Sequence, residues 1–253
     1  MTIIRILRFC GLALLLAFGA PVALAAAMHW AGDELDWRAA RRDSAGLLPK
    51  IETAPHAMVR VFAARTVRWR GIFATHCWIV VKDENGQRYE RFDYTGWGEP
   101  VRINGYAPDG LWFGREPELL LAVDGEKARQ AIPKLRAAIA SYAFRAQGDY
   151  RAWPGPNSNS FVATVLAAAP ELRAKLPTTA IGKDFPVDGN WLASTPSGTG
   201  YRFSAGGYGG ITLGWYEGIE LSLFGAVLGL ELRRPAINLP ALGRFGVPDQ
   251  PMR

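Results

Sequence analysis

The hydrophobic pattern of the chain changes from a continuous apolar run near its start to alternation further on. Met58–Arg65 alternates with the two-residue period of a strand. Residues 72–82 and 88–95 are rich in β-branched and aromatic side chains, which favour strands. Between them stands Asn85-Gly86, the dipeptide most typical of a two-residue hairpin turn. We therefore predict three strands, the last two joined as an antiparallel hairpin.

Helical spacing follows these strands. Residues 118–123 predict a fourth strand, and residues 126–147 carry apolar side chains three to four positions apart, as in a helix. A second helix is predicted from about Ser158 to Ala168. Strands followed by a helix pair and then a further β-rich stretch are typical of an α+β fold. We expect an antiparallel sheet packed with a helix pair.

The last third of the chain is richer in glycine. We interpret residues 177–210 as loops, and residues 214–232 as two strands or one strand with a bulge, because glycines interrupt their alternation. The chain then divides into a connector over residues 29–55 and one α+β domain over residues 56–253. Within that domain we expect a core over 56–170 and a loop- and β-rich C-terminal extension over 171–253.

The N-terminal segment carries an export signal. Arg5 and Arg8 precede an uncharged apolar stretch over residues 9–28, which ends in small residues. This arrangement is typical of a secretory signal peptide, and the stretch is also long enough to span a bilayer. Residues 1–28 are thus either a cleaved signal or a membrane anchor, and in both cases the rest of the chain crosses the membrane. We expect the domain in the periplasm, released or anchored to the inner membrane.

Composition narrows the functional classes. The 253 residues are 49% hydrophobic and 21% charged, which suits one folded domain and excludes a disordered chain. The net charge is +6, but no nucleic-acid-binding motif accompanies the basic residues, so we expect no nucleic-acid partner. Two cysteines and three histidines show no metal-ligand spacing, and we expect neither a metal nor a cofactor.

Two segments carry candidate chemistry, one on a strand and one at a helix start. Ser158 opens the second predicted helix, where free backbone N–H groups and the helix dipole stabilise an anionic nucleophile and an oxyanion. His76 lies on the second predicted strand, where an imidazole can act as a general base. Such a pair also needs a third polar group to orient the histidine.

Strand register identifies that third group. If Asn85-Gly86 forms a two-residue turn, counting outward pairs Trp78 with Asp93 and places Asp93 on the same face as His76. The hypothesis is therefore a catalytic set of Ser158, His76 and Asp93. Cys77 points to the opposite face of the strand, and we expect it to be a buried core thiol.

The residues around this set are candidates for substrate binding. Two asparagines flank Ser158, two aromatic residues precede it, and one tryptophan shares the strand face of His76. Each also has a structural interpretation, because Asn and Ser are ordinary N-caps and most tryptophans belong to the core. The candidate binding residues are Asn157, Asn159, Tyr150, Trp153 and Trp78.

A strand histidine followed by the helix start Asn157-Ser158-Asn159-Ser160-Phe161 resembles circularly permuted papain-like proteins. That group is similar to NlpC-type cell-wall peptidases and includes desumoylating isopeptidases and relatives of lecithin retinol acyltransferase. Their motif reads Asn-Cys-x-x-Phe, so the resemblance implies a permuted papain-like fold with Ser158 at the nucleophile position and His76 at that of the base. The whole chain also resembles a bacterial envelope family, domain of unknown function 3750.

Three functions remain open at this stage. The first is a Ser/His hydrolase or acyltransferase acting on an amide or ester, with cell-wall peptides or lipids as substrates. The second is a non-catalytic pseudo-enzyme that binds a cell-wall fragment, lipid or protein partner in the same cleft. The third is a structural module held on a membrane surface by its arginines.

Overall fold

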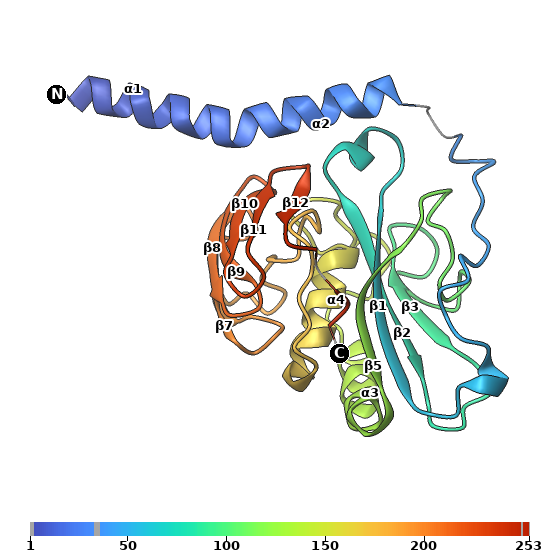
Figure 1. Cartoon of the computed structure of the whole chain (residues 1–253). Coiled ribbons are helices and arrows are strands. Elements are labelled where there is room, and N and C mark those ends of the chain that lie inside the picture. Colours follow the sequence, from blue (N-terminus) through green and yellow to red (C-terminus); the bar gives the residue numbers. More distant parts are fainter. Residues whose placement is uncertain (1–2, 33–35, 249, 253) are drawn as a thin grey trace.

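A five-stranded antiparallel sheet carries the first half of the domain in the computed structural model, which describes residues 3–32, 36–248 and 250–252 (Figure 1). Its order is β4-β3-β2-β1-β5. The bounds are Val101–Ile103 for β4, Glu90–Tyr94 for β3, Thr75–Lys82 for β2, Met58–Arg65 for β1 and Glu118–Asp124 for β5. Strand β1 has the predicted bounds. Strand β4 was not expected, because three residues are too few to show alternation.

The register between β2 and β3 is the one that the sequence predicts. Ile79 lies opposite Phe92 and Val81 opposite Glu90. The turn itself differs from the prediction, because the N–H of Gly86 bonds to the carbonyl of Asp83 (3.0 Å) and the linking loop covers residues 83–89. The tight turn therefore lies one residue earlier, and the longer loop preserves the register.

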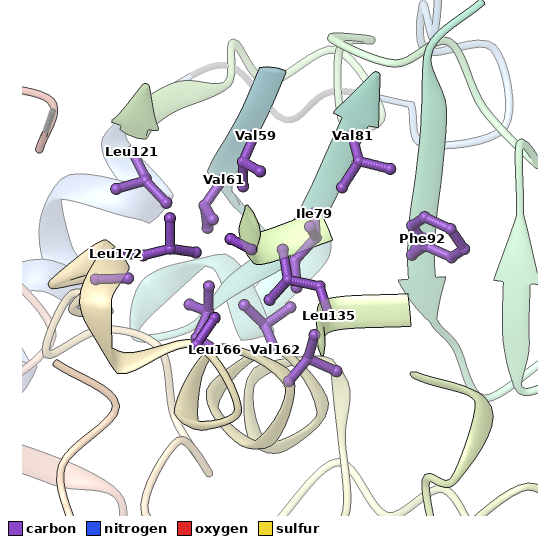
Figure 2. Packing of buried hydrophobic residues seen from close by; sticks show 14 of the residues in the cluster. Val59, Val61, Ile79, Val81, Phe92, Leu121, Leu135, Val162, Leu166 and Leu172 are labelled. Atoms are coloured by element: carbon purple, nitrogen blue, oxygen red, sulfur yellow. The ribbon is translucent and has the colours of Figure 1, made fainter. Parts of the chain in front are cut away.

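Two helices cover one face of this sheet. They are α3 (Gly125–Ala140) and α4 (Ser158–Ala167), and α4 packs against β2. Figure 2 shows Val162 and Leu166 of α4 among the β1 and β2 side chains Val61 and Ile79. All four are fully buried, and burial of such side chains stabilises a fold by about 1.5–3 kcal/mol each.

Helix α3 is shorter than predicted and ends at Ala140 rather than near residue 147. The reason is packing beyond its end. Tyr142 is buried, with its ring 5.0 Å from that of Phe161 and 5.3 Å from that of Tyr94. The chain leaves helical geometry so that this aromatic ring enters the core.

The connector covers the opposite face of the sheet. Buried aromatic residues gather there around Trp78 and Trp112. The carboxylate of Asp109 accepts hydrogen bonds from the Ser44 hydroxyl (2.7 Å) and from the N–H of Leu47 (2.6 Å). Part of the connector is thereby fixed to the loop that follows β4; residues 33–35 of the predicted connector lie outside the described residues.

A second antiparallel sheet of seven strands follows the helices, and the loops predicted over residues 177–210 are wrong in part. Its order is β12-β11-β10-β9-β8-β7-β6, a simple meander. Frequent glycines and short strands hid the alternation of its first members. The bounds are Leu192–Ser194 for β6, Gly200–Ser204 for β7, Gly209–Gly214 for β8, Gly218–Leu223 for β9, Ala226–Glu231 for β10, Ala236–Leu239 for β11 and Gly243–Gly246 for β12.

Met252 connects the two sheets at the end of the chain. It forms a parallel bridge with Leu121 of β5, the edge strand of the five-stranded sheet. The carbonyl of Met252 accepts from the N–H of Ala122 (2.8 Å), and its N–H donates to the carbonyl of Leu120 (3.1 Å). The chain thus returns to the first sheet after completing the second.

The N-terminal segment forms a continuous apolar helix of 29 residues, Ile3–Ala31, compatible with a signal peptide or a membrane anchor. It comprises α1 (Ile3–Leu14), η1 (Leu15–Gly19) and α2 (Ala20–Ala31). Helix α2 contacts η3 (Arg68–Ile72), and η1 contacts β10. In Figure 1, α1 extends beyond the domain on the side of the seven-stranded sheet.

Candidate functional site

Asn157 is the N-cap of α4 and organises its first turn. Its side-chain Oδ1 accepts hydrogen bonds from the backbone N–H groups of Asn159 (2.9 Å) and Ser160 (3.1 Å), and the Ser160 hydroxyl accepts from the Asn157 N–H (2.7 Å). The Asn157 amide donates to the carbonyls of Ala152 and Ile181, both at 3.0 Å. This is a complete capping box. The N–H groups of residues 159 and 160 are therefore already occupied by the cap.

Asn159 joins α4 to the backbone of β2. Its Oδ1 accepts from the Cys77 N–H (3.2 Å), and its amide donates to the carbonyls of Thr75 (2.9 Å) and Ile181 (2.8 Å). Ser158 lies beside it with only 4% of its surface exposed, and its hydroxyl has a long contact of 3.5 Å to Asn159 Oδ1. The candidate nucleophile is therefore shielded from solvent, and both asparagines serve the fold.

His76 and Asp93 meet as the register predicts. The His76 Nε2 lies 2.8 Å from Asp93 Oδ1, and it is the donor because an ionised carboxylate only accepts. Arg91 holds the same carboxylate through two hydrogen bonds of 2.7 and 2.9 Å. The imidazole is stacked on Trp112, with ring centroids 3.7 Å apart and 7° between planes. The guanidinium of Arg91 lies over the ring of Trp78, 4.1 Å from its centroid.

Burial sets the ionisation of this cluster. It lowers the pKa of His76, and the hydrogen bond and charge of Asp93 oppose that change only in part. Burial acts to raise the pKa of Asp93, but the Arg91 charge and the hydrogen bonds from His76 and Arg91 outweigh it and lower the pKa. The resulting state is a neutral imidazole beside a carboxylate–guanidinium pair, which is a stable structural arrangement.

The structure corrects the predicted contact between Ser158 and His76. Side chains of β2 alternate between faces, and Cys77 belongs to the cluster that α4 covers. His76 points the other way, toward Trp78 and Trp112. Within the described residues, no hydrogen bond joins the Ser158 hydroxyl to the imidazole, whose hydrogen-bond partner is Asp93. Of the three predicted catalytic residues, the structure brings together only His76 and Asp93.

Cys77 follows His76 on β2 and points to the face that α4 covers. It is fully buried, and burial raises the pKa of its thiol to about 12. A thiol with that pKa stays protonated at neutral pH and is a poor nucleophile. The expectation of a buried core thiol is confirmed.

The three aromatic candidates differ in exposure. Trp78 is fully buried and donates its Nε1–H to the carbonyl of Pro108 (2.9 Å), so it cannot reach a ligand. Tyr150 is half-buried and packs against the core, with its ring 5.5 Å from that of Tyr94. Trp153 is 40% exposed, with its ring 5.0 Å from that of Tyr208. Trp153 is therefore the most exposed of the three and the best placed to contact a ligand.

Trp153 lines an apolar pocket of about 400 Å³ beside the α4 cap. Pockets that hold small ligands have volumes of about 300–1,000 Å³. Its walls come from the N-terminal helix, η3, the loop before α4 and the β9–β10 hairpin, and Arg70 supplies the one charged group of the lining. The principal lining residues are Val22, Trp69, Phe73, Trp153, Ile181 and Phe224. Because these residues are far apart in the sequence, only Trp153 could have been identified before the structure.

A larger cavity of about 560 Å³ lies between the two sheets and is lined by charged side chains. In its wall, Glu231 accepts from Lys175 (2.7 Å), Arg244 (3.1 Å) and the Asn238 amide (3.0 Å), so these four side chains form one ion-paired cluster. Among the described residues, no three His, Cys, Asp or Glu side chains form a group that could hold a metal ion.

Residues 56–185 match the family described as Protein of unknown function (DUF3750). The chain belongs to this family. The DUF3750 match begins just before β1 and includes the five-stranded sheet, α3, α4 and Ile181 of the apolar pocket. The seven-stranded sheet lies outside the match. No curated protein and no solved structure matches this DUF3750 chain.

Proposed function

We propose that the chain is a non-catalytic, membrane-tethered module of the bacterial envelope that binds a lipid acyl chain in the apolar pocket beside Trp153. The observation that carries the proposal is the pocket itself. Its lining is almost entirely apolar, with Arg70 as the one charged residue. An apolar chain would fill this space while an anionic headgroup paired with the guanidinium.

The geometry at α4 favours binding over hydrolysis. A Ser/His hydrolase needs the hydroxyl within hydrogen-bond reach of the base, about 2.6–3.2 Å. His76 points to the sheet face opposite the one that α4 covers, and both Ser158 and His76 are only 4% exposed. The capped N-terminus of α4 on β2 supports the proposal of a permuted papain-like fold that has lost its catalytic pair.

Packing of the N-terminal helix supports a retained anchor rather than a cleaved signal. Ala25 is buried in a small cluster with Ile72 and Ala241, and Val22 lines the pocket. Cleavage after the apolar stretch would remove this wall and expose the cluster. Arg5 and Arg8 precede the apolar stretch, so the positive-inside rule favours the domain on the periplasmic side.

A photoreactive fatty acid tests the pocket directly. The full chain in bilayer nanodiscs is irradiated with the probe, and the cross-linked peptides are mapped by mass spectrometry. We expect adducts on the segments that contain Trp153 and Phe224. Ile181→Trp fills the pocket and should reduce these adducts at least tenfold, equivalent to about 1.4 kcal/mol of binding free energy.

Two matched variants serve as controls. Ser158→Ala should bind as the parent does, because its hydroxyl does not face the pocket lining. Trp97→Ala removes a tryptophan that is 48% exposed and does not line the pocket, and it should also be neutral. Adducts confined to the N-terminal helix, or adducts unchanged by Ile181→Trp, would refute binding of the acyl chain in the pocket. Covalent labelling of Ser158 by a serine-reactive phosphonate would instead support a hydrolase function.

A further inference from the structure

The seven-stranded sheet turns its apolar face outward. Side chains directly opposite one another on neighbouring strands form two rows across this face. One row is Leu192, Phe203, Ile211, Leu221 and Leu228, and the other is Tyr201, Leu213, Ile219, Leu230, Ile237 and Phe245. All of these except Leu228 are among the exposed large hydrophobic residues. In the described strands, no charged residue belongs to either row.

The inner face of the same sheet is polar. Glu220 is buried there and accepts from Lys183 (2.5 Å), and Glu231 is held by Lys175 and Arg244. Sheets with one solvated face ordinarily direct their polar side chains to water and their apolar side chains to the core. This sheet has the reverse polarity, and its regular alternation makes the outer face a contiguous apolar surface of a kind that marks an interaction site.

Aromatic residues with polar groups lie at the margins of this face. Trp191 precedes β6, Tyr208 stands in the β7–β8 turn and Trp215 in the β8–β9 turn, each at least half exposed. Trp and Tyr are enriched at membrane–water interfaces, where the ring contacts lipid and the N–H or O–H meets water. The margin therefore has the composition of a membrane-contacting surface.

The N-terminal helix places this sheet beside the bilayer. The η1 segment contacts β10, and α1 extends past the domain on the side of the seven-stranded sheet (Figure 1). Helix α1, the part of this helix that extends past the domain, has 12 residues, about 18 Å at about 1.5 Å per residue, so it reaches into a hydrocarbon core of about 30 Å beside the seven-stranded sheet. A chain whose helix enters the membrane would hold the adjoining apolar face close to the lipid.

We propose that the outer face of the seven-stranded sheet rests in the lipid surface of the membrane that the N-terminal helix enters. The occupant of this face is the interfacial region of the bilayer itself. This second membrane contact fixes the orientation of the domain, which a single helix would leave free to rotate. It rests on the retained helix of the proposed function but does not depend on a ligand in the pocket.

Depth-dependent quenching of a fluorescent label tests this contact in the full chain. Cys10→Ser leaves Cys77, which is buried, so a single new cysteine can be labelled. Labels at Ile211→Cys and Tyr201→Cys sample the two rows, and both native side chains are exposed. Gln130→Cys, at an exposed position on α3, is the matched control. The variants are reconstituted into phosphatidylethanolamine–phosphatidylglycerol vesicles.

We expect labels in both rows to be quenched several-fold more by a lipid-borne nitroxide than by aqueous iodide, and the control label to show the opposite. Adding Leu213→Asp to the Ile211→Cys variant should reduce lipid quenching without changing circular dichroism. Iodide quenching of both row labels would overturn the proposal. Protection from both quenchers, with energy transfer between labelled copies, would assign the face to a second copy and would also overturn it. Fatty-acid cross-linking at Trp153 reports on the pocket separately.

Discussion

Ser158 and Asn159 are neighbours that should respond very differently to substitution. Replacing Asn159 with leucine keeps the volume of the side chain but removes its hydrogen bonds to β2. The N–H of Cys77 and the carbonyl of Thr75 would lose their Asn159 partner in a buried site, whereas the Ile181 carbonyl keeps its bond from Asn157.

The expected loss of unfolding free energy follows from the Cys77 N–H and the Thr75 carbonyl. A buried polar group left without a partner costs about 1–3 kcal/mol, so Asn159→Leu should lower the free energy of unfolding by about 2–6 kcal/mol. Ser158→Ala removes a hydroxyl with a single contact of 3.5 Å and introduces a better helix former. Its effect should stay within about 0.5 kcal/mol, as for most substitutions that break no such feature.

Thermal unfolding of the full chain in one detergent, followed by tryptophan fluorescence, separates the two outcomes. At about 2–4 °C per kcal/mol for a chain of this size, Asn159→Leu should lower Tm by at least about 4 °C and Ser158→Ala by less than about 2 °C. Equal shifts for the two variants would contradict the structural role assigned to this helix start. A large loss for Ser158→Ala alone would show that its hydroxyl makes an interaction that we have not recognised.

Three further predictions concern the buried polar cluster and the domain thiol. Asp93→Asn leaves the Arg91 guanidinium buried without a counter-charge and should cost about 3–5 kcal/mol in urea unfolding; a loss below about 1 kcal/mol would contradict the pairing. Because burial lowers the pKa of His76, the unfolded chain takes up its proton first, so unfolding free energy should fall as pH decreases below about 6.5, and His76→Gln should flatten that slope. With its pKa raised to about 12, Cys77 should not react with a maleimide in a Cys10→Ser chain until urea unfolds it; rapid native labelling would show that the thiol is accessible.

The alternation of side chains along the sequence was sufficient to predict the β2–β3 register and the pairing of His76 with Asp93. Both depend on residues close in sequence, because β2 and β3 are adjacent strands and side chains alternate strictly along each. The predicted register is correct although the turn is displaced, because the longer loop keeps the same residues opposite one another. Counting along a hairpin is therefore informative even when the turn type is wrong.

The face covered by a helix could not be read in the same way. Ser158 and His76 are separated by more than eighty positions, so counting along a hairpin cannot place them relative to each other. One signal was present in β2 itself. Cys77, Ile79 and Val81 make one face mainly apolar, whereas the other face carries His76 and Lys82. An apolar helix is expected to cover the more apolar face, which would have placed α4 on the side away from His76.

The first strands of the seven-stranded sheet, β6 to β8, were missed for a different reason, whereas β9 and β10 lie where two strands were expected. The alternation of the sheet is regular at Tyr201 and Phe203 and again at Ile211 and Leu213, but each strand is short and bounded by glycine. A period of two also does not say which face is buried. The outward direction of the apolar rows follows from the ion pairs on the inner face, which join residues distant in the sequence.

The return of Met252 to β5 has a consequence for self-association through strand edges. An edge strand offers unpaired N–H and C=O groups to any other extended chain. Here the backbone of Met252 occupies two of those groups on β5, at Leu120 and Ala122. The last described residues therefore cover part of the exposed edge of the five-stranded sheet. A truncation before Gln250 would leave β5 free to template intermolecular strand pairing even if both sheets kept their own hydrogen bonds.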